Sequence, residues 1–170
     1  MDQRNLISRN TLINALVKNG KYQNALKIFL DIWNDGFKPD ATMITLILDF
    51  IPDIAGLREV KQIHGYAVKT GFTPNTFVLN SLVYAYAKSD DLDSCRGIFN
   101  RILTKYIVSL NTIILANGFR GSGEISLNLF SKMMKNDIKP NLSTFFSVLS
   151  ACSFSGMVEE GWKYLGRVKI

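Results

Sequence analysis

The stretch GFKPD at residues 36–40 decides the fold, because it returns along the chain at regular intervals. It recurs 35 residues later as GFTPN at residues 71–75, and a third time as DIKPN at residues 137–141. The last interval is 66 residues, which divides into one unit of 31 residues and one of 35. Self-similarity at such a period predicts a repeat architecture.

Two further markers share this register. The sequence NTLI at residues 10–13 returns as NSLV at residues 80–83 and as NTII at residues 111–114, at offsets of 70 and then 31 residues. Glycine occupies one equivalent position in three units, at Gly20, Gly121 and Gly156. The agreement predicts a single array over residues 1–170, with units at 6–40, 41–75, 76–106 and 107–141 and a partial unit at 142–170.

Each unit carries two runs of apolar residues at helical spacing, such as Leu12, Ile13 and Leu16, followed by Ala25, Ile28, Phe29 and Ile32. Gly36 and Gly71 can take the left-handed conformation that ends a helix, and the prolines that follow prevent its continuation. One helical pair cannot bury its apolar face alone, whereas stacked pairs share a core. We therefore predict an all-α fold, a right-handed α-solenoid of helix-turn-helix repeats of 31 to 35 residues.

The composition supports a folded chain that prefers polyanionic partners. Of the 170 residues, 47% are hydrophobic and 20% are charged, and the net charge is +6. The most apolar run, residues 44–57, is interrupted by Asp49 and Asp53, so we expect no membrane span. Cys95 and Cys152 form no CxxC pair and are expected in the core. No transit peptide is visible in residues 1–5.

The 35-residue helical pair that ends in GxxPD and opens with NTLI resembles the pentatricopeptide repeat, which is known mostly from plant organelle RNA-binding proteins. Unit lengths of 35, 35, 31 and 35 residues are similar to the alternating P, L and S motifs of the plant-type PLS subfamily. KQIHGYAVKTGF at residues 61–72 is similar to an L motif, and residues 80–99 are similar to the short S motif. SVLSACSFSGMVEEGWKY at residues 147–164 is similar to the L motif that often precedes the C-terminal extensions of this family.

The resemblance implies that each repeat binds one nucleotide of single-stranded RNA, which is specified by the fifth and the last residue of the repeat. Short amide, hydroxyl or carboxylate side chains can match the exposed edge of an unpaired base. The implied pairs are Asn10 with Asp40, Thr45 with Asn75, Asn80 with Tyr106, and Asn111 with Asn141. They imply the order pyrimidine, adenine, pyrimidine, pyrimidine. The fifth unit offers Phe146 and no last residue.

The resemblance implies that two further sets of residues contact the RNA. The resemblance places Ile7, Phe77 and Val108 at the second position of a unit, where they would pack on base faces. Lys18, Lys88 and Arg120 lie near the end of a first helix and could contact phosphates, with binding that weakens as salt rises.

Each of these residues also has a purely structural interpretation. Asn10, Asn80 and Asn111 could cap helices or serve local structure, and their shared register favours base reading instead. Asp40, Asn75 and Asn141 follow proline in turns, where Asp and Asn are frequent. The three basic residues could be solvated and interact with the helix dipole.

We predict no catalysis, no cofactor, no metal site and no small-molecule substrate. His64 occupies a unit position that Phe holds elsewhere, so we expect it to be packed, and no deaminase, P-loop or GxSxG motif is present. The expected function is sequence-specific RNA binding in organellar RNA editing or processing, in the mitochondrion or the chloroplast. Expected partners are single-stranded RNA and organellar editing cofactor proteins. A protein-interaction scaffold and a non-catalytic remnant of a longer editing factor are the alternatives.

Overall fold

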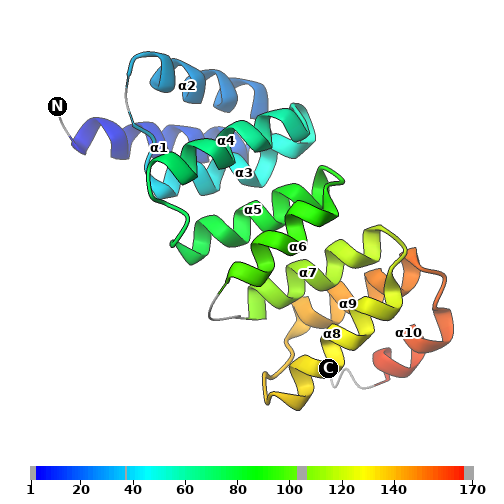
Figure 1. Cartoon of the computed structure of the whole chain (residues 1–170). Helices are drawn as coiled ribbons and strands as arrows, with labels where there is room; N and C mark the ends of the chain where they lie inside the picture. Colours follow the sequence, from blue (N-terminus) through cyan, green and yellow to red (C-terminus); the bar gives the residue numbers. More distant parts are fainter. Residues whose placement is uncertain (1–2, 37, 103–106, 167–170) are drawn as a thin grey trace. The chain divides into compact units, whose positions relative to one another are not determined.

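A computed structural model of the chain describes residues 3–36, 38–102 and 107–166, apart from the side chains of residues 3–7 and 165. These residues form α-helices and no strand (Figure 1). In chain order the helices are α1 (Gln3–Lys18), α2 (Tyr22–Asn34), α3 (Ala41–Ile54), α4 (Leu57–Lys69), α5 (Thr76–Lys88), α6 (Leu92–Arg101), α7 (Ile107–Phe119), α8 (Gly123–Lys135), α9 (Leu142–Phe154) and α10 (Val158–Leu165). Within the described part, no helix is both long and apolar enough to cross a membrane.

The chain divides into two compact units, Met1–Asp90 and Asp91–Ile170. The first contains α1 to α5 and the second contains α6 to α10. The division falls inside the third predicted repeat, between its two helices.

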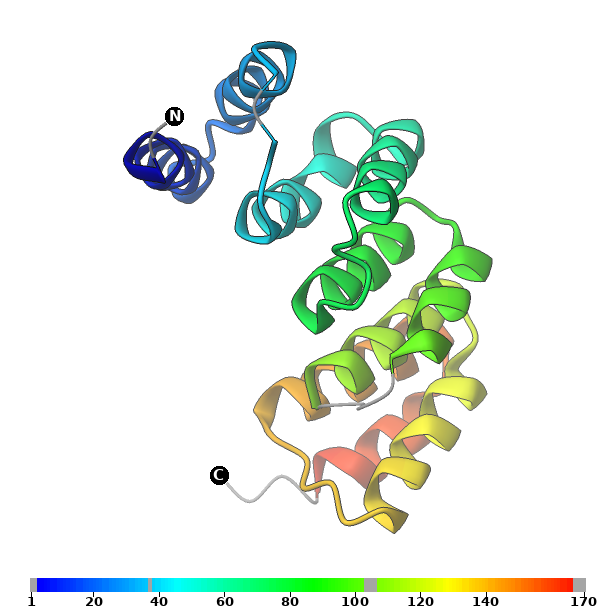
Figure 2. The ribbon, with the colours of Figure 1, turned by 60° about the vertical axis from the view of Figure 1, so that its left-hand side comes forward.

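In the first unit the helices form two layers. The first helices of successive repeats, α1, α3 and α5, lie in one row, and the second helices α2 and α4 lie in the other (Figure 2). Helix α3 packs against both α1 and α5 and contributes fully buried side chains such as Ile44 and Ile47. Leu82 of α5 and Ile13 of α1 are equally buried, so neighbouring repeats share one core.

In the second unit, α7 packs against its own partner α8 and against the next first helix, α9. The α7–α9 packing is close, because a Cβ atom added to Gly118 would lie 2.4 Å from Ala151 Cα. The hydroxyl of Ser126 on α8 donates to the carbonyl oxygen of Ile114 on α7 at 2.7 Å, which fixes that pair of helices.

The first helices begin in register with the repeats. Helices α3, α5, α7 and α9 start at Ala41, Thr76, Ile107 and Leu142, which are the first residues of the predicted units. Gly36 and Gly71 take the predicted left-handed conformation, with φ of 79° and 77°. The turns inside the repeats are left-handed at Gly20, Gly121 and Gly156. The prediction of an all-α solenoid of helix-turn-helix repeats is therefore confirmed.

Candidate nucleic-acid interface

The last residues of three repeats cap the helix that follows them. A side-chain oxygen of Asp40 accepts a hydrogen bond from the backbone N–H of Met43 at 2.8 Å, at the start of α3. Asn75 accepts from Phe77 N–H at 2.9 Å in the same way at α5, and Asn141 accepts from the Thr144 N–H of α9. The structural interpretation of these residues is therefore correct, and it leaves their remaining polar atoms for other contacts.

The fifth residues do not act as caps. Asn10, Asn80 and Asn111 lie inside α1, α5 and α7, so the capping alternative for them is wrong. Asn10 instead donates from Nδ2 to the two carboxylate oxygens of Asp40, at 3.3 and 3.2 Å. Asn111 Nδ2 donates to Asn141 Oδ1 at 3.4 Å. In both compact units the fifth residue therefore meets the last residue of its own repeat.

These hydrogen bonds fix the orientation of the amides. The Asp40 carboxylate can only accept hydrogen bonds, and Asn141 presents its Oδ1, which also accepts from a backbone N–H. The amide of Asn10 or Asn111 must therefore turn its nitrogen toward the oxygen of the last residue. The side-chain oxygens of Asn10, Asn80 and Asn111 are buried and form no hydrogen bond in the structure. Asn111 is 8% exposed, and the other two are half-buried. The same position in three repeats therefore retains unused acceptor capacity.

The second and third repeats differ from this arrangement. Thr45 donates from Oγ1 to the carbonyl oxygen of Thr42 at 2.7 Å, within its own helix. Asn75 is engaged as the cap of α5. Each of these two predicted base-reading residues is thus bonded to its own helix. Tyr106, the last residue of the third repeat, lies outside the described residues.

The second positions present apolar side chains to solvent. Phe77 is 77% exposed and Val108 is 57% exposed, on the first turns of α5 and α7. The side chain of Ile7 lies outside the described part of the chain. When a flat ligand covers a large apolar group that is exposed on a folded chain, the removal of apolar surface from water favours binding.

The three basic residues have different environments. Lys18 and Arg120 are exposed at the ends of their helices. Lys88 is held by Asp53, with Nζ 2.8 and 2.9 Å from the two carboxylate oxygens. Burial alone lowers the pKa of Lys88, but hydrogen bonds to Asp53 and Tyr84 outweigh it and raise that pKa above its ordinary value.

The ion pair of Lys88 was missed by the sequence reasoning, although a signal existed. Asp53 lies 35 residues before Lys88, at the same position of the preceding repeat. Since equivalent positions of stacked first helices are neighbours, the repeat register alone could have paired the two charges.

The groups that could support catalysis are engaged in packing. His64 lies with Nδ1 2.9 Å from Tyr86 Oη, and the two rings meet edge to face. Cys95 and Cys152 are buried, and burial raises the pKa of the Cys95 thiol to about 12. In the part of the chain that the structure describes, no group of three or more His, Cys, Asp or Glu residues could hold a metal ion.

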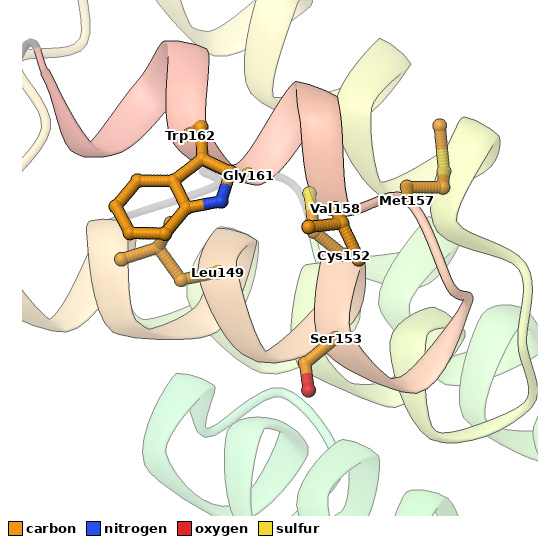
Figure 3. Close-up of a pocket in the computed structure, with 7 residues that line it drawn as sticks. All are labelled: Leu149, Cys152, Ser153, Met157, Val158, Gly161 and Trp162. Carbon is orange, nitrogen blue, oxygen red and sulfur yellow. The ribbon is translucent and has the colours of Figure 1, made fainter.

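A hollow of about 240 Å³ lies between α9 and α10, where the ring of Trp162 lies beside Leu149 (Figure 3). Its lining is apolar except for a thiol and a hydroxyl group, and it consists of Leu149, Cys152, Ser153, Met157, Val158, Gly161 and Trp162. Burial raises the pKa of the Cys152 thiol above its ordinary value, so the neutral thiol is favoured there.

The architecture and the paired polar residues define a helical-repeat protein. Residues 7–37 and 77–107 match the PPR repeat family, and residues 103–154 match the pentatricopeptide repeat domain. The chain therefore belongs to the pentatricopeptide repeat family.

Two relatives from Arabidopsis thaliana illustrate the similarity. The chloroplastic pentatricopeptide repeat-containing protein At4g35130 is 46% identical over 99% of this chain and 21% of its own length. The putative pentatricopeptide repeat-containing protein At3g23330 is 35% identical over 95% of this chain and 22% of its own length. The chain thus spans about a fifth of the length of these relatives.

The fold is also found in a solved structure. The crystal structure of the pentatricopeptide repeat protein PPR10 in complex with an 18-nt psaJ RNA element superimposes with a TM-score of 0.82 at 20% identity. The match covers 95% of this chain and 24% of that one. This likeness establishes the helical solenoid fold.

Proposed function

We propose that the chain binds single-stranded RNA, one base per repeat, through the fifth and last residues of repeats at 6–40, 41–75, 76–106 and 107–141. The observation that carries the proposal is the recurrence of one polar pair. Asn10 meets Asp40 and Asn111 meets Asn141, each 30 residues apart and each in a different compact unit. The recurrence of the pair in the repeat register supports a role that successive repeats share.

The chemistry of the pair suits a nucleobase. A carboxamide offers one acceptor and two donors, and its pairing with a second oxygen-bearing side chain leaves the amide oxygen as the unused acceptor. Phe77 and Val108, at the second positions, supply exposed apolar surface on which a base can pack. The relative PPR10 was crystallised with an RNA element, which supports the same class of ligand for this chain.

The similarity to chloroplastic relatives supports an organellar role, in the chloroplast or the mitochondrion. The motif lengths favour the PLS subfamily and hence RNA editing or processing, with editing cofactor proteins as further partners. No step of catalysis is assigned to this chain, because its His and Cys side chains are packed in the fold. The repeats would position an activity that another domain or protein supplies.

The test is binding of the purified chain to a panel of short single-stranded RNAs containing pyrimidine, adenine, pyrimidine, pyrimidine and its single-base variants, at two salt concentrations. Asn111→Thr should shift the preference at the fourth position from pyrimidine toward purine. Asn128→Thr, on the exposed face of the second helix α8, is the matched control and should leave every preference unchanged. An unaltered preference in a folded Asn111→Thr variant would contradict the proposal.

A protein-interaction scaffold is the second candidate, and one observation favours it. Phe146, the fifth residue of the last repeat, is 65% exposed, where the other repeats place an amide or a hydroxyl group. If no substitution at a fifth position changes the RNA affinity, the result would support this alternative.

A further inference from the structure

The second unit exposes an aromatic pair that the base-reading positions do not include. Phe119 ends α7 and Phe154 ends α9, and their ring centroids are 5.0 Å apart with the planes inclined by 59°. Phe119 is 45% exposed and Phe154 is 56% exposed. The two residues are 35 positions apart, so they occupy the same position of successive repeats.

The pair results from the close approach of the two helices. Gly118 lies against the backbone of Ala151, with no room for a side chain between them. Two residues after each helix, the chain turns at a left-handed glycine, Gly121 or Gly156. Phe119 and Phe154 are therefore held together by backbone packing, and the exposed rings are presented on a rigid base.

The aromatic pair continues the surface on which we place the RNA. Val108, Thr112, Leu115 and Phe119 follow one another at intervals of four, three and four residues, which places them on one face of α7. With a rise of about 1.5 Å per residue, Phe119 lies about 16 Å along the helix from Val108. The stripe that begins at a base-packing position thus ends at the exposed rings.

The composition of this face suits a nucleobase, which is flat and uncharged and is attached to an anionic phosphate backbone. Neither α7 nor α9 contains a charged residue, so no carboxylate on these helices repels a phosphate near the rings. Arg120 is exposed next to Phe119, and Lys and Arg outnumber Asp and Glu in residues 91–170. The first unit differs at this position, where Lys88 is bound to Asp53.

We propose that Phe119 and Phe154 form a stacking platform for a nucleobase of single-stranded RNA, additional to the base-reading pairs. This proposal rests on the proposed RNA-binding function. Every base has a π face, so the platform holds the strand without selecting its sequence. The pair occupies, in the second unit, the repeat position that Lys18 and Lys88 hold in the first.

The test compares RNA affinities of the whole chain and a variant carrying Phe119→Leu and Phe154→Leu, which keep the apolar volume and remove the rings. We expect binding of a short single-stranded RNA to weaken about 5- to 150-fold, the effect of losing base–aromatic stacking. The slope of log K against log salt should not change, because stacking releases no counterions. Phe119→Trp should retain the affinity. Trp162→Leu, which removes an exposed aromatic ring from α10, is the matched control and should have no effect.

Photo-crosslinking gives an independent readout. RNAs that carry 5-iodouridine at successive positions should crosslink to a peptide containing Phe119 or Phe154 at one of those positions. Unchanged affinity of the double variant, as expected if the rings serve a protein partner, would overturn the platform. The RNA-binding proposal would then still stand if Asn111→Thr changes base preference. Failure of the unaltered chain to bind RNA would overturn both.

Discussion

The side-chain amide of Asn10 donates to both carboxylate oxygens of Asp40, although the two residues lie at opposite ends of one repeat. Asp40 also accepts the Met43 N–H at the start of α3. A single carboxylate thus links the first helix of one repeat to the first helix of the next. The link places both residues of the proposed base-reading pair in one polar site.

Replacement of this carboxylate by an amide should change the base and leave the fold intact. Asp40→Asn retains an oxygen for the Met43 N–H, and Asp and Asn cap helices about equally well, so the thermal midpoint should not move. The variant makes the first pair chemically equal to Asn111 with Asn141. In the resembling family, Asn with Asp favours uracil and Asn with Asn favours cytosine. The resemblance therefore implies a shift of preference from uracil to cytosine at the first position, which a panel of single-base RNA variants measures.

The control for this change is Asp91→Asn. Asp91 caps α6 through the Ser94 N–H at 3.0 Å, at the start of a second helix rather than a first. It should leave both stability and base preference unchanged. Equal effects of the two variants on RNA binding would show that Asp40 acts through charge alone.

Release of Lys88 should strengthen its interaction with phosphate. Asp53→Asn removes the carboxylate that holds the Lys88 ammonium group at 2.8 Å. We expect tighter binding to any single-stranded RNA, and a salt dependence that is steeper by about 0.7 in the slope of log K for each further phosphate that the protein neutralises. Titrations at several salt concentrations measure both quantities. Asp31→Asn, on the exposed side of α2, is the control, and a similar increase in affinity from it would indicate a general charge effect.

The packing of α7 against α9 should not tolerate a methyl group. Gly118→Ala would place Cβ 2.4 Å from Ala151 Cα and 2.6 Å from its Cβ, so the helices must separate. We expect a loss of about 1–3 kcal/mol in the free energy of unfolding, the usual effect of overpacking. Urea denaturation measures this change.

Gly97→Ala is the matched control in the interior of α6. A Cβ atom there meets nothing within 4 Å, so the substitution should raise the free energy of unfolding by about 0.5–1 kcal/mol through helix propensity. Changes of the same sign in the two variants would contradict the packing argument.

The thiol of Cys95 should report unfolding. Because burial raises its pKa from the ordinary value of 9.0 to about 12, almost no thiolate exists at pH 8 in the folded chain. The folded state binds the proton more tightly than the unfolded state, so this thiol lowers stability as the pH rises above 9.0. Labelling with iodoacetamide at pH 8 should require denaturant, and rapid labelling of the native chain would contradict the assignment.

Much of the fold follows from spacing alone. The first residues of the predicted repeats coincide with the starts of α3, α5, α7 and α9. Before α3, α5 and α9, a Pro–Asp or Pro–Asn ending stops one helix and caps the next. The second repeat is less regular. Its internal turn has Ala55 at the position where the other repeats have a left-handed residue, Gly20, Asp90, Gly121 or Gly156, and the left-handed residue is Gly56 instead. The left-handed conformation follows the glycine, which stands one residue later in this repeat.

The sequence was sufficient to predict which residues form the candidate site, but not which hydrogen bonds they make. Register identified Asn10 and Asp40 as related positions, but a hydrogen bond between them depends on how far the next helix turns back toward the first. The same limit applies to Phe119 and Phe154. Their equivalence is visible in the sequence, whereas their exposure depends on the Gly118–Ala151 approach.

The oxygen at the end of a repeat has two tasks, because Asp40 and Asn141 both anchor the following helix and complete the polar pair. Leucine or lysine at this position would leave the first backbone N–H groups of the following helix without their side-chain cap. The first, second and fourth repeats end in such a helix-capping residue, whereas the third ends in Tyr106. Where a repeat ends in a capping residue, the helix that follows limits the choice of side chain before any nucleic acid is bound.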